Sequence, residues 1–278
     1  MEVTRLEASR YVQPLREGGS LPAIVDTDTG GLFVVKFRGA GQGAKVLVAE
    51  LVVGGIAARL GLPLPALAIV DISPRFGRSE PDPEIQDLLR RSHGVNVGMR
   101  YLEGAFNFDP SAAGELIAPD LAAQIVWLDA FTTNPDRTAR NPNLLIWNRS
   151  PWLIDHGAAL YAHHDWNGVD EARTASPFQM IRSHVLLTSA GDLRAAHDAS
   201  RARITPNEIE EVLATVPDAL LMDDVSGPVD FSSADEARAR YTRYLRERLA
   251  AADAWIAEAE RAQEQRRIEQ PQHLKARR

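Results

Sequence analysis

Short apolar runs separated by turn residues dominate the first third of the chain. Residues 23–25 and 32–37 favour β-structure, and the polar, glycine-containing segment 26–31 between them has turn chemistry. This stretch therefore predicts a β-hairpin. Further apolar runs at residues 67–72 and 95–102 predict two more strands, so the beginning of the chain is expected to fold as a small sheet.

One helix interrupts these strands. Apolar residues continue from about Lys45 to Leu60, and Gly61 followed by Pro63 is a usual helix end. The polar, proline-containing stretch 73–93 is expected to be part helix and part surface loop.

After residue 104 the apolar positions recur with a helical period. An amphipathic helix is predicted over residues 119–133, with its apolar stripe at Leu121, Ile125, Leu128 and Phe131. Short apolar runs at 143–147 and 152–154 predict a second, small hairpin. The later helices are expected at residues 177–187, 206–215 and 233–265.

This order of elements predicts an α+β, two-lobed architecture. Residues 1–103 would form a small β-rich lobe with one key helix, and residues 104–278 a mainly helical lobe. A cleft between two lobes is the default place for a ligand.

Composition narrows the function classes. The 278 residues contain no cysteine, which excludes disulfides, thiolate metal sites and a cysteine nucleophile. Because 31 basic and 38 acidic residues give a net charge of −7, we expect no duplex nucleic acid partner. The chain shows neither an apolar stretch of membrane-spanning length nor an apolar signal core at its N-terminus. We therefore expect a cytoplasmic protein with no membrane partner.

Two charged residues interrupt apolar runs. Lys36 lies in a run that is apolar on both faces, and Glu50 is the only charge between Val46 and Ala58. A lysine at a strand end often extends its ammonium to water, but the helix around Glu50 has no polar face. An unpaired buried carboxylate costs several kcal/mol, so we expect Lys36 and Glu50 to pair.

A second set of polar residues surrounds the predicted small hairpin. Asp136 and Asn141 lie in the loop before it, and Asp155 follows its second strand. A hairpin returns the chain close to its start, so Asn141 and Asp155 can lie on the same side. Two such oxygen ligands suit Mg²⁺, which completes its shell with phosphate and water, and Asp136 would remain available to receive a proton.

The adjacent residues 163–165, His-His-Asp, have the composition of a metal cluster. Consecutive side chains do not readily converge on one ion. We therefore expect a solvated loop at this position.

In chain order, these residues resemble the protein-kinase set: a strand lysine, a helix glutamate, an aspartate with an asparagine five residues later, and an aspartate before x-Gly. The loop Asn134-x-Asp136-Arg137 with Asn141 is similar, more closely, to the catalytic loop of HipA-like kinases. The resemblance covers roughly residues 15–160.

The resemblance implies an ATP-dependent kinase that transfers the γ-phosphoryl group of Mg-ATP to a hydroxyl acceptor, a serine or threonine of a protein. Lys36, held by Glu50, would contact the α- and β-phosphates, and Asp136 would act as the catalytic base. The implied Mg²⁺ ligands are Asn141 and Asp155. The implied ATP-binding positions are Gly18, Gly19, Ser20, Lys36, Tyr101 and Leu102, the last two in a hinge over residues 99–103.

The sequence also departs from these patterns. Thr138 follows Arg137 where HipA-like loops commonly have histidine, and Asp155-His-Gly157 stands in place of Asp-Phe-Gly. Two alternatives stay open: a small-molecule kinase, which would share every ATP-side residue, and a nucleotide-binding pseudokinase that serves as an interaction module.

Overall fold

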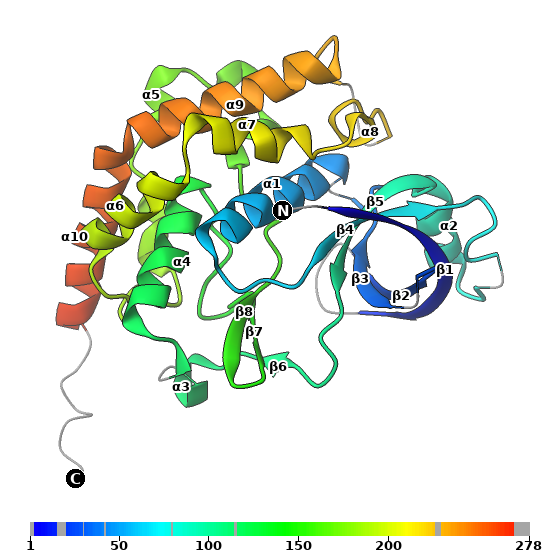
Figure 1. The fold of residues 1–278 in the computed structure, drawn as a ribbon, viewed down its shortest axis with the longest axis horizontal. Helices are drawn as coiled ribbons and strands as arrows, with labels where there is room; N and C mark the ends of the chain where they lie inside the picture. Colours follow the sequence, from blue (N-terminus) through cyan, green and yellow to red (C-terminus); the bar gives the residue numbers. More distant parts are fainter. Residues whose placement is uncertain are drawn as a thin grey trace.

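A closed β-barrel and a body of helices make up the chain, and α1 lies between them (Figure 1). The computed structural model describes residues 3–15, 21–29, 31–41, 43–78, 80–113, 116–225 and 229–269. In this part of the chain, no helix combines the length and the apolar character needed to cross a membrane.

The barrel strands follow the order β1-β2-β3-β5-β4, with β1 and β4 parallel. Their bounds are β1 Thr4–Pro14, β2 Ala23–Thr27, β3 Leu32–Lys36, β4 Leu67–Ile72 and β5 Gly94–Arg100. The predicted β2–β3 hairpin is confirmed, and the strands expected at 67–72 and 95–102 correspond to β4 and β5. The sequence analysis did not predict β1, a strand in which only Leu6 and Ala8 are buried.

The helix α1 (Gly43–Leu60) is buried along most of its length. It packs against β5 and also against the helices α7 (Pro206–Ala214) and α8 (Asp218–Leu221). The approach to α7 is close, because a Cβ atom at Gly55 would lie 2.8 Å from Val212. The apolar residues of α1 therefore share one core with the helical body, whereas the barrel interior forms a second core. The expected lobe boundary at residue 103 stays a prediction.

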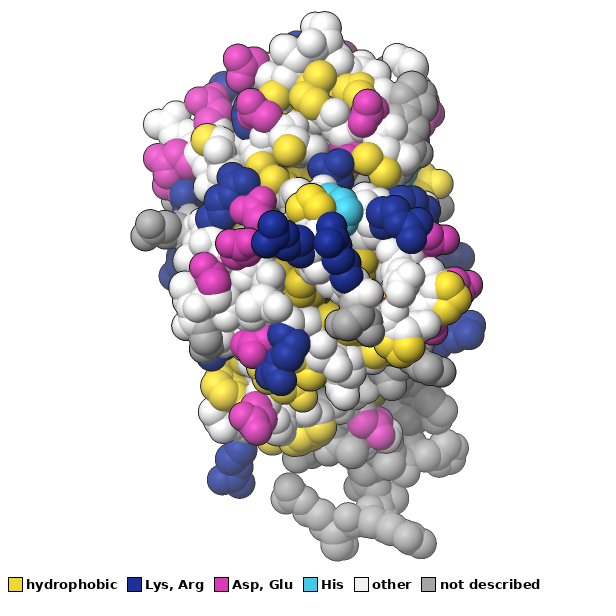
Figure 2. Space-filling model, turned by 90° about the vertical axis from the view of Figure 1, so that its right-hand side faces the viewer, with side chains coloured by type: hydrophobic (Ala, Val, Ile, Leu, Met, Phe, Trp, Pro, Cys, Tyr) yellow, Lys and Arg dark blue, Asp and Glu magenta, His cyan; other side chains and the backbone are white. Residues whose placement is uncertain are grey.

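The helix α2 (Pro83–Arg91) covers the barrel. Asp82 caps its N-terminus by accepting a hydrogen bond from Glu84 N–H, and Leu88 and Leu89 enter the barrel core. On the barrel side of the molecule, basic side chains lie across the middle of the surface with acidic ones beside them (Figure 2). Within α2, Arg90 and Asp87 form an ion pair at 2.5 Å.

The helix α4 (Pro119–Phe131) is central to the helical body. It is buried on almost all sides, so the prediction of an amphipathic helix was wrong in character, although its position was right. The helices α6 (Leu193–Arg203), α10 (Ala252–Glu269) and α1 pack around it, and within α4 only Pro119 and Asp120 at its start are exposed. The predicted small hairpin is present as β7 (Leu144–Trp147) and β8 (Ser150–Leu153), with β6 (Phe106–Asn107) beside β7.

The later helices differ from the prediction in two places. A helix expected at 177–187 is only a 3-10 turn over Gln179–Ser183, and the true helix follows as α6 (Leu193–Arg203). The expected 233–265 helix is interrupted at Ala251. The remaining helices are α3 Pro110–Ala113, α5 Glu171–Thr174, α9 Ala234–Ala250 and α10 Ala252–Glu269, and the 3-10 turns before α5 are η2 Tyr161–His164 and η3 Trp166–Gly168.

A buried arginine fixes the C-terminal end of α4. The guanidinium of Arg248, on α9, donates to the carbonyl oxygens of Ala130 and Phe131 at 2.7 Å each. It also donates to the carbonyls of Thr174 and Ser176 at 3.0 and 3.2 Å. These contacts satisfy carbonyl groups that a helix end leaves without partners, and the negative end of the helix dipole stabilises the cation.

Replacing Arg248 with methionine is expected to destabilise the protein by about 2–4 kcal/mol, because four carbonyl groups lose a charged donor inside the protein. The measurement is the free energy of unfolding in urea. The exposed Arg243 on the same helix is the matched control, and Arg243→Met should change that free energy by less than about 0.5 kcal/mol. Equal effects of the two substitutions would contradict a tethering role.

Candidate active site

A cavity of about 560 Å³ opens between the barrel and the β7–β8 hairpin. Its barrel side includes Val34, Val97 and Gly98, and its other side includes Leu145 and Ile154. Lys36, Glu50 and Asp155 also line it. The cavity is thus mainly apolar, with a compact group of charges on its wall.

The predicted ion pair between Lys36 and Glu50 is present. The Lys36 ammonium also contacts Asp155 Oδ1 at 2.5 Å. These three residues come from β3, from α1 and from the chain just after β8, so the ammonium connects the barrel to the helical body. The Glu50 side chain is only 2% exposed, whereas that of Asp155 is 45% exposed.

Burial and neighbouring charges act in opposite directions on the pKa values of Lys36 and Asp155. Burial lowers the pKa of Lys36, but the carboxylates of Glu50 and Asp155 outweigh it and raise that pKa above its ordinary value. Burial likewise opposes ionisation of Asp155, but Lys36 holds the pKa of this carboxyl below its usual range. The lysine is therefore a cation and Asp155 an anion at neutral pH.

The backbone after β8 is unusual in two ways. Asp155 has a left-handed backbone with φ 54°, a conformation that costs free energy for a residue with a side chain. Two residues later, a Cβ atom at Gly157 would lie 2.4 Å from Val46 Cγ1 and 3.3 Å from Glu50 Oε1. Glycine at this position therefore lets the chain pass directly against α1 beside the charged group.

Two amide side chains hold Asp136. Asn141 Nδ2 donates to Asp136 Oδ2 at 2.7 Å, and Asn143 Nδ2 donates to the same oxygen at 3.1 Å. Among the described residues, the other oxygen, Oδ1, accepts no hydrogen bond, so it keeps its lone pairs for an incoming group. Asp136 and Asn141, five residues apart in the sequence, are thus in direct contact, and Asn143 is a contact that the sequence analysis missed.

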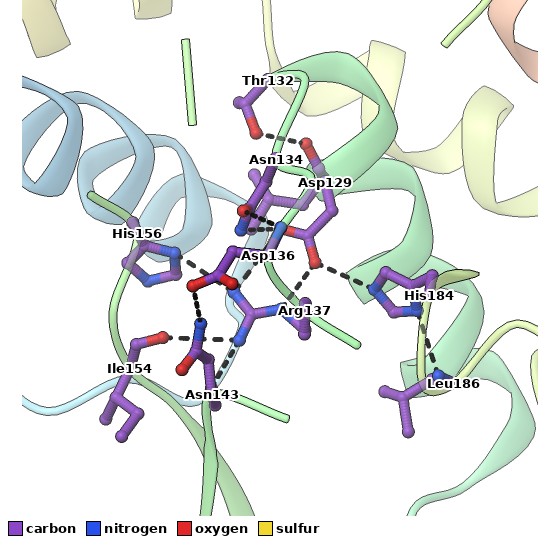
Figure 3. Close-up of polar contacts among 11 residues, drawn as sticks. Asp129, Thr132, Asn134, Asp136, Arg137, Asn143, Ile154, His156, His184 and Leu186 are labelled. Atoms are coloured by element: carbon purple, nitrogen blue, oxygen red, sulfur yellow. Dashed lines mark hydrogen bonds and ion pairs between the residues drawn. The ribbon is translucent and has the colours of Figure 1, made fainter. Parts of the chain in front are cut away.

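A buried network of hydrogen bonds and ion pairs holds this loop (Figure 3). Asp129, on α4, accepts from Arg137 Nε at 2.5 Å, from Asn134 Nδ2 at 3.0 Å and from His184 Nε2 at 2.9 Å. Burial opposes ionisation of Asp129, but Arg137 and His184 outweigh it and keep its pKa below the usual range. Arg137 also donates to the carbonyls of Asn143 and Ile154.

The network fixes the protonation of His184. The backbone N–H of Leu186 donates to His184 Nδ1 at 3.0 Å, so this nitrogen is an acceptor and the proton is on Nε2. Burial lowers the pKa of His184, which agrees with an uncharged ring that donates to Asp129. The sequence analysis missed Asp129 and His184.

The predicted nucleotide positions fall into two groups. Tyr101 and Leu102 follow β5 and line the cavity. Gly18, Gly19 and Ser20 lie outside the described residues, although Leu15 and Pro22 on either side of them line the cavity and are joined by a hydrogen bond of 2.7 Å from Leu15 N–H to Pro22 C=O.

The expectation of a solvated loop at residues 163–165 was wrong for His163. Its side chain is fully buried, and Nδ1 lies 3.0 Å from the hydroxyl of Tyr241. Asp165 is exposed and pairs with Arg173. No group of three or more His, Cys, Asp or Glu side chains that could hold a metal is present in the described part of the chain.

The side chains of Asn141 and Asp155 are of the kind that fits Mg²⁺ sharing its shell with phosphate, although only Asp155 lines the cavity. Asn141 binds Asp136 through its amide nitrogen, which leaves its amide oxygen as a possible ligand, and Asp155 supplies a carboxylate. The backbone N–H of Ile154 donates to Asn143 C=O at 3.1 Å, so the two chain segments that carry these groups lie side by side. Mg²⁺ commonly uses only one or two protein ligands of this kind when it binds with a nucleotide.

Comparison with known proteins agrees with this geometry. The sequence model of the HipA-like kinase family matches residues 9–243. The chain belongs to the HipA-like kinase family. No curated protein matches the sequence.

A solved structure shares the fold of this HipA-like kinase. The crystal structure of a Helicobacter pylori proinflammatory kinase, CtkA, is similar with a TM-score of 0.51, and the match covers 95% of this chain and 99% of that chain. The two sequences are 14% identical, so the likeness concerns the fold alone.

The contacts of Lys36 predict that substitutions of Lys36 and of Glu50 lower the free energy of unfolding by unequal amounts. Lys36→Met leaves Glu50 buried without its cation and is expected to cost about 3–5 kcal/mol, whereas Glu50→Gln leaves Lys36 with Asp155 and should cost less. Because the two substitutions remove the same ion pair, adding Glu50→Gln to the Lys36→Met variant should restore about 1–3 kcal/mol of its free energy of unfolding.

A double-mutant cycle in the free energy of unfolding measures this coupling. The partly exposed pair Lys45 and Asp230, 2.7 Å apart, is the matched control, and its cycle with Lys45→Met and Asp230→Asn should give less than about 1 kcal/mol. Equal coupling in the two cycles would contradict a special role for burial.

Acid should destabilise the protein in part through His156. Burial, assisted by the charge of Arg137, lowers the pKa of His156 from 6.5 to about 3. Between these two pKa values the unfolded state binds more protons at His156 than the folded state does. The free energy of unfolding therefore falls as the pH is lowered, and His156 does not affect it above pH 6.5.

His156→Gln keeps an acceptor for Arg137 but removes the titration. Below pH 6.5, the unfolding free energy of this variant should fall less steeply than that of the wild type, by up to about 1.4 kcal/mol per pH unit. Urea unfolding between pH 8 and pH 5 gives both slopes, and the difference between the two proteins should be constant above pH 7. Parallel slopes below pH 6.5 would show that His156 titrates normally.

Proposed function

We propose that this HipA-like kinase transfers the γ-phosphoryl group of Mg-ATP to a hydroxyl acceptor, a serine or threonine of a protein. The observation that carries the proposal is the contact of Lys36 with both Glu50 and Asp155 on the wall of the cavity. A strand lysine paired with a helix glutamate, beside an aspartate that can hold Mg²⁺, is the arrangement that binds nucleotide phosphates in protein kinases.

The rest of the cavity suits an adenine ring. Val34 and Val97 on the barrel side and Ile154 opposite provide apolar surfaces of the kind that flat, aromatic ligands contact. The backbone N–H of Leu102 has no hydrogen-bond partner among the described residues, and Leu102 lines the cavity. We propose that this N–H donates to the adenine ring.

The phosphates would then compete with Asp155 for Lys36. Glu50 stays with the ammonium because it is buried, whereas Asp155 is partly exposed and can turn toward a metal ion. Mg²⁺ held by Asn141 and Asp155 would neutralise charge on the phosphate oxygens. Lys36 would contact the α- and β-phosphates and orient the γ-phosphate toward the acceptor.

Asp136 would complete the transfer. Asn141 and Asn143 both bind Oδ2, which would leave Oδ1 for the acceptor hydroxyl. As the acceptor oxygen bonds to the γ-phosphorus, the bond from that phosphorus to the bridging oxygen of ADP breaks. The hydroxyl proton passes to Asp136 Oδ1.

Two substitutions should separate proton transfer from phosphate binding. Asp136→Asn cannot accept the proton and is expected to lower kcat about 100-fold or more, with nucleotide affinity unchanged. Asp155→Asn removes the metal carboxylate and should abolish Mg²⁺-dependent stabilisation by ATP. In the wild type, ATP at a hundred times its Kd adds about 2.7 kcal/mol to the free energy of unfolding.

The measurements are thermal unfolding with Mg²⁺ and ATP, and phosphate transfer to dephosphorylated casein as a general protein acceptor. Asp198, which is exposed, provides the control variant Asp198→Asn, which should match the wild type in both assays. An unfolding temperature that is indifferent to millimolar Mg-ATP would count against the site. Binding without transfer to casein or to the chain itself would favour a pseudokinase or a small-molecule acceptor.

A further inference from the structure

The steps proposed above give no role to the network around Asp129, although it contacts the loop that carries Asp136 (Figure 3). Asp129, Arg137 and His184 are 0%, 1% and 3% exposed. Burying an ion pair costs several kcal/mol per ion, and well-packed apolar residues would often stabilise a fold equally well. The stability of the fold therefore does not explain these three polar residues.

Asp129 reaches the backbone of Asp136 through Asn134. The side chain of Asn134 donates to Asp129 Oδ1 at 3.0 Å, and its backbone N–H donates to the carbonyl of Asp129 at 2.8 Å. The side-chain oxygen of Asn134 in turn accepts from the backbone N–H of Asp136 at 3.1 Å. A displacement of Asp129 therefore displaces the backbone that carries the proposed base.

Arg137 connects the same carboxylate to the hairpin that precedes Asp155. It donates to Asp129 Oδ2 through Nε, and through Nη1 to the carbonyls of Asn143 and Ile154. The loop of Asp136 and the chain that leads to Asp155 are thus held by one guanidinium.

His184 connects a third chain segment, residues 184–186, to the same network. It forms an isolated β-bridge with Thr138, and the backbone N–H of Val185 donates to the carbonyl of Arg137 at 3.0 Å. The ring accepts from Leu186 N–H and donates to Asp129, so residues 184–186 are attached to the catalytic loop by both backbone and side chain.

We propose that Asp129 and His184 are positioning residues of the phosphoryl transfer. Neutral His184 holds the Asp129 carboxylate against Arg137 and Asn134, and this contact orients Asp136 relative to both Asp155 and the 184–186 segment. The inference rests on the proposed function, because it assigns the network to the geometry of that reaction.

Two substitutions of nearly equal size test it in the full chain. His184→Gln keeps an amide N–H that can donate to Asp129, whereas His184→Leu has no donor. His184→Leu is expected to lower kcat for phosphate transfer to dephosphorylated casein about 10- to 100-fold, because small misplacements of reacting groups are costly. ATP affinity, measured by equilibrium binding, should stay within about twofold. His184→Gln should recover most of the lost kcat.

Asp129→Asn provides a second route if His184→Leu does not fold. It keeps the size of the side chain, removes the charge that binds Arg137 and His184, and should show the same loss of kcat without loss of ATP affinity. Equal kcat in His184→Leu and His184→Gln, an unchanged kcat in Asp129→Asn, or a parallel loss of ATP affinity and kcat would each overturn the proposal.

Hydrogen exchange separates this inference from the proposed function. Without nucleotide, the peptide that contains Asp136 should exchange faster in His184→Leu than in His184→Gln or the wild type, because the Asn134 contact to Asp136 N–H loosens. Equal exchange in the three proteins would overturn the positioning role. Failure of the wild type to bind or use ATP would instead overturn the proposed function and leave the exchange result to decide the network.

Discussion

The buried carboxylate of Glu50 is the constraint around which the rest of the site is arranged. It lies on a helix that is packed between the barrel and the helical body, so water cannot solvate it. A cation must therefore reach it, and Lys36 does so from the barrel side. The same ammonium contacts Asp155, which places a partly exposed carboxylate at the wall of the cavity. One electrostatic requirement thus brings residues from three distant parts of the chain together.

The packing of α1 explains why this arrangement is rigid. Its apolar residues share a core with α7, α8 and α4, so Glu50 is held by the helical body rather than by the barrel. Gly157 lets the chain after Asp155 pass closely against Val46 of the same helix. Changes in the position of the barrel would therefore alter the contact of Lys36 with Glu50, which the helical body holds in place.

The helix α4 provides a second fixed point. Its C-terminal carbonyls are held by Arg248, and Asp129 near the same end holds Arg137, Asn134 and His184. The loop that begins at this end carries Asp136, and positive φ angles at Thr133 and Asn143 show that its path is not a relaxed one. The surrounding hydrogen bonds offset the cost of these backbone conformations.

The sequence by itself determined the barrel hairpin, α1 and the small hairpin, because apolar runs and turn residues mark them locally. It also determined the ion pair of Lys36 with Glu50, because charges inside apolar runs need partners whatever the detailed fold. The motif around Asp136 also pointed to the family. Only the tertiary structure decided the roles of Asp129 and His184. In the sequence, Asp129 is a charged residue of a helix predicted to be amphipathic, and nothing in that pattern marks it as buried; the helices packed around α4 bury it. His184 is 55 residues away from Asp129 in the chain, and no local pattern encodes a contact between groups that far apart.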